Sequence, residues 1–107
     1  AIPDDIKQVV ADWKGIIRDL SGMTKTYLRS ARLSLGGENR LQIVFEDETA
    51  YDFVNRDVQK QELIEAIESR IGKQVELDIK LVDQGRSFED SFVDIEKIVN
   101  MDITIED

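Results

Sequence analysis

The sequence predicts one α+β domain over residues 1–107, in which helices cover one face of a small sheet. Three observations predict this class. The chain has 107 residues and 41% of them are apolar, enough for a single core. Apolar residues recur at helical spacing in some segments and alternate with polar residues in others. Glycine-containing turns separate these segments. We expect the order α-α-β-β-α-β, followed by a short C-terminal helix and a tail.

Two helices are predicted to open the chain. The first is amphipathic, because its apolar residues recur at spacings of three and four: Ile6, Val9, Val10, Trp13, Ile16, Ile17 and Leu20. The acidic pair at positions 4–5 can cap it, and Ser21-Gly22 is expected to end it. We expect Trp13 to belong to the core. A shorter helix is predicted over residues 24–31.

A β-hairpin is predicted next. Leu33 and Leu35 alternate with polar residues, residues 36–39 contain two glycines and an asparagine, and residues 41–45 are rich in β-forming side chains. Such a pattern is typical of two strands joined by a tight turn.

A helical stretch followed by a strand is predicted after the hairpin. The stretch starts at Asp47 and ends at Gly72, and residues 55–57 leave open whether it is one helix or two. Residues 75–81 alternate strictly between apolar and charged side chains, which predicts a strand with one buried face.

The C-terminal residues 86–107 are the least determined part of the sequence. Residues 88–99 carry apolar side chains at helical spacing, and we expect a short helix that packs on the core. Met101, Ile103 and Ile105 alternate with polar residues, so they form either a final edge strand or a disordered end that waits for a partner. An edge strand offers unpaired backbone groups, which makes these three residues candidates for partner binding.

The composition excludes several function classes. The chain has 23 acidic and 14 basic residues and a net charge of −9, which opposes bulk attraction to nucleic acid or anionic membranes. It contains no cysteine and no histidine, so thiolate chemistry and histidine-based catalysis are excluded. No apolar run is long enough to span a bilayer. We therefore expect a cytoplasmic, non-enzymatic domain without a metal or cofactor.

One basic patch stands against the acidic background. Lys25, Arg29 and Arg32 have the spacing i, i+4, i+7 of a single helix face, and Arg40 can join them across the turn. This patch could contact a phosphate backbone, which gives the alternative function of a nucleic-acid-binding module. The acidic second half of the chain instead predicts a basic partner surface and salt-sensitive association.

Several residue patterns spread over most of the chain resemble one known family. They are Asp12-Trp13, Ile16-Ile17, Leu33-Ser34-Leu35, Leu41-Gln42-Ile43-Val44-Phe45, Glu62-Leu63-Ile64-Glu65-Ala66-Ile67, the Gly-Lys-x-Val element of Gly72 to Val75, and the acidic end from Asn100 to Asp107. Together they are similar to the C-terminal domain of the gamma/tau subunit of bacterial DNA polymerase III, of the clostridial type.

The resemblance implies a fold like the K homology (KH) domain without its RNA-clamping GXXG loop, since Gly72 to Val75 lacks the second glycine. It also implies a non-catalytic role: tethering the clamp loader to the catalytic subunit of the replicative DNA polymerase, to the replicative helicase, or to both. The family's ATPase motifs are absent from this chain. No individual binding residue is carried over, because the matched patterns are mainly hydrophobic spacing.

Overall fold

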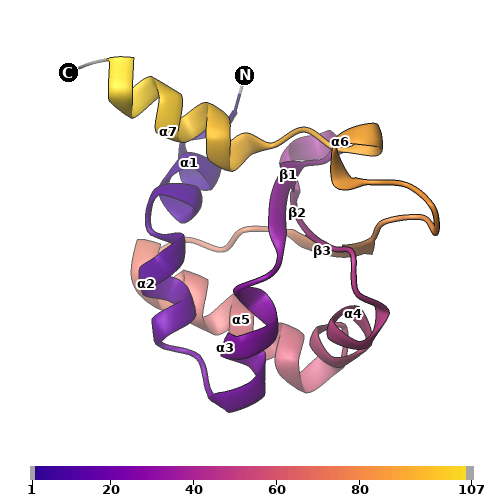
Figure 1. Ribbon diagram of the computed structural model, residues 1–107. Coiled ribbons are helices and arrows are strands. Elements are labelled where there is room, and N and C mark those ends of the chain that lie inside the picture. The colour runs from indigo at the N-terminus through magenta and orange to yellow at the C-terminus, as the bar shows by residue number, and fades with distance from the viewer. Residues whose placement is uncertain (1, 106–107) are drawn as a thin grey trace.

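The computed structural model describes the backbone of residues 2–105 and the side chains of residues 2–100 (Figure 1). Its elements follow the chain in this order: α1 (Asp4–Ala11), α2 (Trp13–Arg18), α3 (Gly22–Leu28), β1 (Arg32–Leu35), the 3₁₀ turn η1 (Gly37–Asn39), β2 (Leu41–Phe45), α4 (Glu48–Val54), α5 (Asp57–Ile71), β3 (Leu77–Leu81), α6 (Phe88–Ser91) and α7 (Ile95–Ile105). The prediction of an α+β domain with a small sheet is confirmed.

The sheet has three strands in the order β1-β2-β3. β1 and β2 are antiparallel, with Leu33 opposite Ile43, which confirms the predicted hairpin. β3 lies parallel to β2 and places Ile79 beside Ile43. A parallel pair needs a long connection, and the helices α4 and α5 provide it. The sheet is therefore mixed, and its central strand is β2.

The predicted first helix is interrupted at Asp12, which separates α1 from α2. The guanidinium of Arg70, at the end of α5, donates to both carboxylate oxygens of Asp12. Gly15 allows this approach, because a Cβ there would clash with Nη2 of Arg70. The second helix is also shorter than predicted: α3 ends at Leu28, before residues 29–31 lead into β1.

The connection between β2 and β3 consists of two helices, which settles the open alternative. Asp47 caps α4 by accepting a hydrogen bond from the amide of Ala50 at 3.1 Å. Gly72 ends α5 as predicted, with a positive φ of 74° that glycine adopts without strain. The strand starts later than predicted, at Leu77, and Val75 is buried in the segment before it.

The main core lies between the sheet and the helices and includes Trp13, as predicted. A second, smaller core lies on the other face of the sheet, where Val44 points away from its neighbours Ile43 and Phe45. There Val44 packs with Val82 and Phe88. The prediction that only one face is covered is therefore corrected, because α6 covers part of the second face.

Residues 88–99 pack on the domain's own cores, as predicted, because Phe88, Ile95 and Val99 are buried. The single short helix predicted there is instead two helices, α6 and the start of α7, separated by residues 92–94. The predicted edge strand at Met101–Ile105 is wrong, because α7 continues as a helix through Ile105. Figure 1 shows α7 lying across α1 at one end of the molecule, with α3 and α4 at the opposite end. Positions 106 and 107 lie outside the described residues.

Candidate interaction surfaces

The four residues of the predicted basic patch do not share one helix face. Lys25 lies on α3 and Arg29 is its C-terminal cap, whereas Arg32 is the first residue of β1. The predicted i, i+7 relation to Arg32 is wrong because the helix ends before it. Arg40 lies at the opposite end of the hairpin, beside the turn. Two of these four cations, Arg32 and Arg40, pair with acids of the chain itself.

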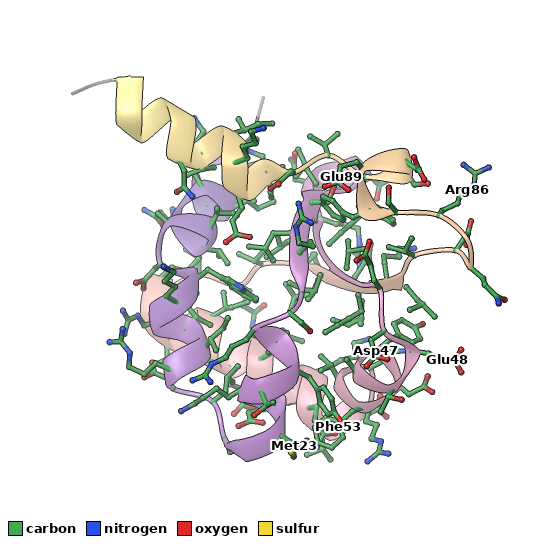
Figure 2. The ribbon with its side chains drawn as sticks, in the orientation of Figure 1. Met23, Asp47, Glu48, Phe53, Arg86 and Glu89 are labelled. Carbon is green, nitrogen blue, oxygen red and sulfur yellow. The ribbon has the colours of Figure 1, made fainter. Side chains whose placement is uncertain are left out.

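Arg32 joins β1 to the C-terminal segment. Its Nη2 lies 2.8 Å from Oδ2 of Asp94 and 3.2 Å from Oε2 of Glu89. The guanidinium carbon also lies 4.4 Å from the centre of the Phe88 ring, a cation–π contact. Figure 2 shows Glu89 on α6, next to the start of β1. Arg32, a predicted candidate for phosphate contact, thus interacts with two carboxylates and an aromatic ring of its own chain.

Two hydrogen bonds fix the position where α7 begins. Oδ1 of Asp94 accepts from the amide of Lys97 at 3.1 Å, which is the geometry of a helix N-cap. The amide of Val93 donates to Oγ of Ser34 at 3.0 Å, and Ser34 is buried on β1. Because Asp94 also holds Arg32, the first turn of α7 is tied to the sheet by backbone and side-chain contacts.

Replacing Asp94 with alanine is expected to lower the free energy of unfolding by about 1–2 kcal/mol, since it removes a helix cap together with a partner of Arg32. Asp94→Asn is the matched control. Asparagine caps helices as well as aspartate does, so this variant should lose clearly less stability. Urea unfolding followed by circular dichroism measures both. Equal losses in the two variants would contradict the capping role.

Arg40 pairs with β3. Its Nη2 lies 2.7 Å from Oδ1 of Asp78, and its Nε donates to Oδ2 at 3.0 Å, so the pair is bidentate. The hydrogen bonds from Arg40 hold the pKa of Asp78 below its ordinary value of 3.8, although partial burial acts in the opposite direction. The pair links the start of β2 to β3.

Asp78→Asn tests this pair through its pH dependence. A carboxylate whose pKa is lowered in the folded state stabilises the fold above its unfolded pKa, and that contribution is lost as the pH falls through the folded pKa. We expect the variant to be less stable at neutral pH by about 1 kcal/mol at most, because both side chains are about a third exposed. The difference should vanish in acid. Glu76→Gln, at a mostly exposed position, should change little at any pH.

An exposed apolar side chain lies on α7, and a second lies just before the helix. Ile98 is 39% exposed, and Val93, just before the helix, is 56% exposed. In a helix, positions 101 and 105 follow Ile98 by three and seven residues and share its face, whereas position 103 follows Val99 by four. Of the three predicted partner-binding positions, Met101 and Ile105 thus share the helix face of Ile98, and Ile103 shares that of Val99.

A second exposed apolar area lies at the opposite end, around α3, α4 and the start of α5. Met23 is 50% exposed and Val58 is 74% exposed. The rings of Tyr27 and Phe53 contact one another at 5.3 Å between their centres, joining α3 to α4. Figure 2 shows Met23 and Phe53 at the end of the molecule away from α7.

A pocket of about 430 Å³ opens between α2, the α3–β1 connection and α7. Its apolar walls come from Trp13, Ile17 and Ala31, and its polar lining from Lys14, Arg29, Ser30, Arg32 and Glu96. Burial raises the pKa of Glu96, and the neighbouring Asp94 carboxylate adds to this effect, while Arg32 and Lys14 oppose it. The pocket thus combines an aromatic wall with three cations and one partly buried acid.

The described residues show no arrangement typical of a metal centre: no three acidic side chains come together there to hold an ion. Within the same part of the chain, no helix is long and apolar enough to cross a membrane. Comparisons with protein-family models, curated proteins and solved structures find no match.

The sequence analysis predicted neither the Asp94 cap that holds the start of α7 nor the pocket. The cap had a local signal, since an aspartate three residues before Lys97 and directly before an apolar helical run is a typical N-cap. The pocket had none, because its lining comes from three segments that only the tertiary fold brings together.

Proposed function

We propose that this domain is a non-catalytic protein-interaction module with a KH-like architecture. In this proposal it is the C-terminal part of a tau-like replicase subunit and tethers the clamp loader to the replicative polymerase catalytic subunit, the helicase or both. The mixed three-stranded sheet, and the residue patterns from Asp12-Trp13 to Gly72–Val75 that resemble that family, support the proposal. The proposal includes a cytoplasmic location, which agrees with the absence of cysteine.

The observation that carries the proposal is the pair of faces on α7. One face is occupied, because Ile95 and Val99 are buried in the core. Ile98, on the same helix, remains 39% exposed, and Val93, in the segment before the helix, is 56% exposed. An apolar helix face packs readily into a groove or against a helix of another protein. Since Asp94 and Ser34 already hold the start of α7, little conformational entropy has to be lost on docking.

The nucleic-acid alternative is less well supported. Arg32 and Arg40 are paired with Asp94 and Asp78, which leaves only half of the predicted patch. The sequence also contains no two glycines three residues apart, so the GXXG backbone clamp of RNA-binding KH domains is absent. Because this chain has a net charge of −9, it would repel a phosphate backbone overall.

Size-exclusion co-elution tests the proposal. The domain is mixed with the replicative polymerase catalytic subunit and, separately, with the replicative helicase, at low and moderate salt. We expect a complex with at least one of them, stronger at low salt because an acidic domain favours a basic partner surface. Retention on single-stranded DNA or RNA should be absent. Failure to bind either protein while circular dichroism shows a folded domain would overturn the proposal.

A further inference from the structure

We propose that the pocket between α2, the α3–β1 connection and α7 binds an acidic peptide segment of the partner, with an apolar side chain against Trp13 and a carboxylate beside Arg29 and Lys14. This inference rests on the proposed function and concerns a single acidic segment of the partner; the basic surface expected of the partner faces the acidic remainder of the domain. The pocket's volume of about 430 Å³ falls within the range of about 300–1,000 Å³ that is usual for ligand sites.

The charges around the pocket favour an anion. Arg32 is already neutralised by Asp94 and Glu89. No salt bridge to Lys14 or Arg29 forms among the described residues, although the charge of Lys14 acts on the Glu96 carboxylate at longer range. Glu96 is the one acid in the lining. With Arg32 neutralised, Lys14 and Arg29 outnumber Glu96 in the lining by one charge, while the two acids on Arg32 bring the wider neighbourhood to three cations and three acids.

The apolar walls favour a ligand with an apolar side chain next to its charge. Trp13, Ile17 and Ala31 form one side of the pocket. Each is only 4–7% exposed, so an apolar group that binds there releases water only from the small surface that they present. A free inorganic anion would leave these walls uncovered. In a peptide with glutamate or aspartate next to an aromatic or aliphatic residue, the carboxylate can pair with the cations and the apolar side chain can pack against the apolar lining.

The pocket and the proposed docking surface share the helix α7. Glu96 lies on α7, two residues before the exposed Ile98. Because residues two apart on a helix point to nearly opposite sides, the pocket and the Ile98 face are separate contacts on α7, and a partner reaches both only by passing around the helix. Such a second, charge-selective contact would add specificity to an otherwise apolar interface.

Fluorescence of Trp13 provides the test, because it is the only tryptophan in the chain and lines the pocket. The probes are two acetylated and amidated tripeptides, phenylalanine between two glutamates and phenylalanine between two lysines. We expect a saturable change in Trp13 emission with the glutamate peptide and at least about tenfold weaker binding of the lysine peptide. Equal responses to both peptides, or no saturable response to either, would overturn the inference.

Variants with opposite expected effects sharpen the test. Arg29→Glu should weaken binding of the glutamate peptide by about tenfold or more, and Arg29→Gln should weaken it less. Glu96→Gln should strengthen binding, because it removes a like charge from the lining. Arg86→Glu is the matched control for the charge change, since Arg86 lies on the loop before α6, far from α2 (Figure 2). Circular dichroism verifies that each variant is folded. If Arg29→Glu behaves like Arg86→Glu, the pocket is not the binding site.

The two experiments distinguish a failure of the pocket inference from a failure of the proposed function. The peptide titration needs only this chain, so a lost response with preserved co-elution would remove the pocket and leave the tethering role. A normal, charge-selective response with no co-elution would support the pocket and remove the replicase partners.

Discussion

Phe88→Ala is expected to lower the free energy of unfolding by about 3–5 kcal/mol, the usual cost of removing a fully buried aromatic side chain. Phe88 is 0% exposed and packs with Val44 and Val82 on the second face of the sheet. Its ring also stacks on the ring of Phe92, with 5.7 Å between the ring centres, and makes the cation–π contact with the Arg32 guanidinium. Because the free energy of unfolding of a domain of this size is about 5–15 kcal/mol, this one substitution removes a large share of the total stability.

Phe92→Ala is the matched control for the loss of Phe88. Phe92 is only partly buried and lies at the margin of the same cluster, so its loss should cost clearly less. Urea unfolding monitored by circular dichroism measures both variants. A loss below about 1 kcal/mol for Phe88→Ala would be typical of a surface substitution and would mean that α6 is not part of the folded domain.

Ile98→Glu is expected to weaken binding to the proposed replicase partner by about 100-fold or more, which is the size of an interface hot spot. The substitution puts a charge in the middle of the proposed docking face on α7. The domain itself should remain folded and lose about 1 kcal/mol or less, because the Ile98 side chain is partly exposed and Ile95 and Val99 fill the core beneath it. Isothermal titration calorimetry with the polymerase subunit or the helicase measures the change.

Val58→Glu makes a similar charge change at the opposite end of the molecule. Val58 is 74% exposed on α5, so this variant should be as stable as the wild type and should bind the partner normally. If Val58→Glu abolishes binding while Ile98→Glu preserves it, the partner docks on the α3–α5 end instead of on α7.

Elements with strong local signals could be predicted from the sequence. The alternation around Leu33 and Ile43 and the turn between them define the hairpin. The left-handed conformation at Gly72, which glycine adopts without strain, defines the end of α5. The alternation from Val75 to Leu81 located β3 to within two residues. In each case the signal depends only on neighbouring residues, so one sequence is sufficient to read it.

Elements that depend on tertiary contacts could not be predicted. The break at Asp12 coincides with an Arg70 side chain from α5, a contact between residues far apart in the sequence. The alternation of Met101, Ile103 and Ile105 predicts either an edge strand or a disordered end, but positions 101 and 105 are also four residues apart and suit the helix that the structure has. The apolar residues at positions 101 and 105 satisfy both periods, and the preceding cap at Asp94 marks the helix.

The prediction that Lys25, Arg29, Arg32 and Arg40 form one basic patch is wrong for a similar reason. Its spacing assumed that a helix continued from Lys25 to Arg32, whereas α3 ends at Leu28. The acids that pair with Arg32 lie more than fifty residues away along the chain, at Glu89 and Asp94. The charge of a side chain can be read from the sequence, but whether the fold neutralises it cannot.

Hydrogen–deuterium exchange of the complex tests the central claim most directly, because it maps the docking face on the unmodified chain. The domain is compared alone and bound to the replicative partner with which it co-elutes. We predict slower exchange of the amides of α7 in the complex, with α4 and the start of α5 unchanged. Protection confined to the α3–α5 end around Met23 and Val58, with α7 exchanging as in the free domain, would contradict the account.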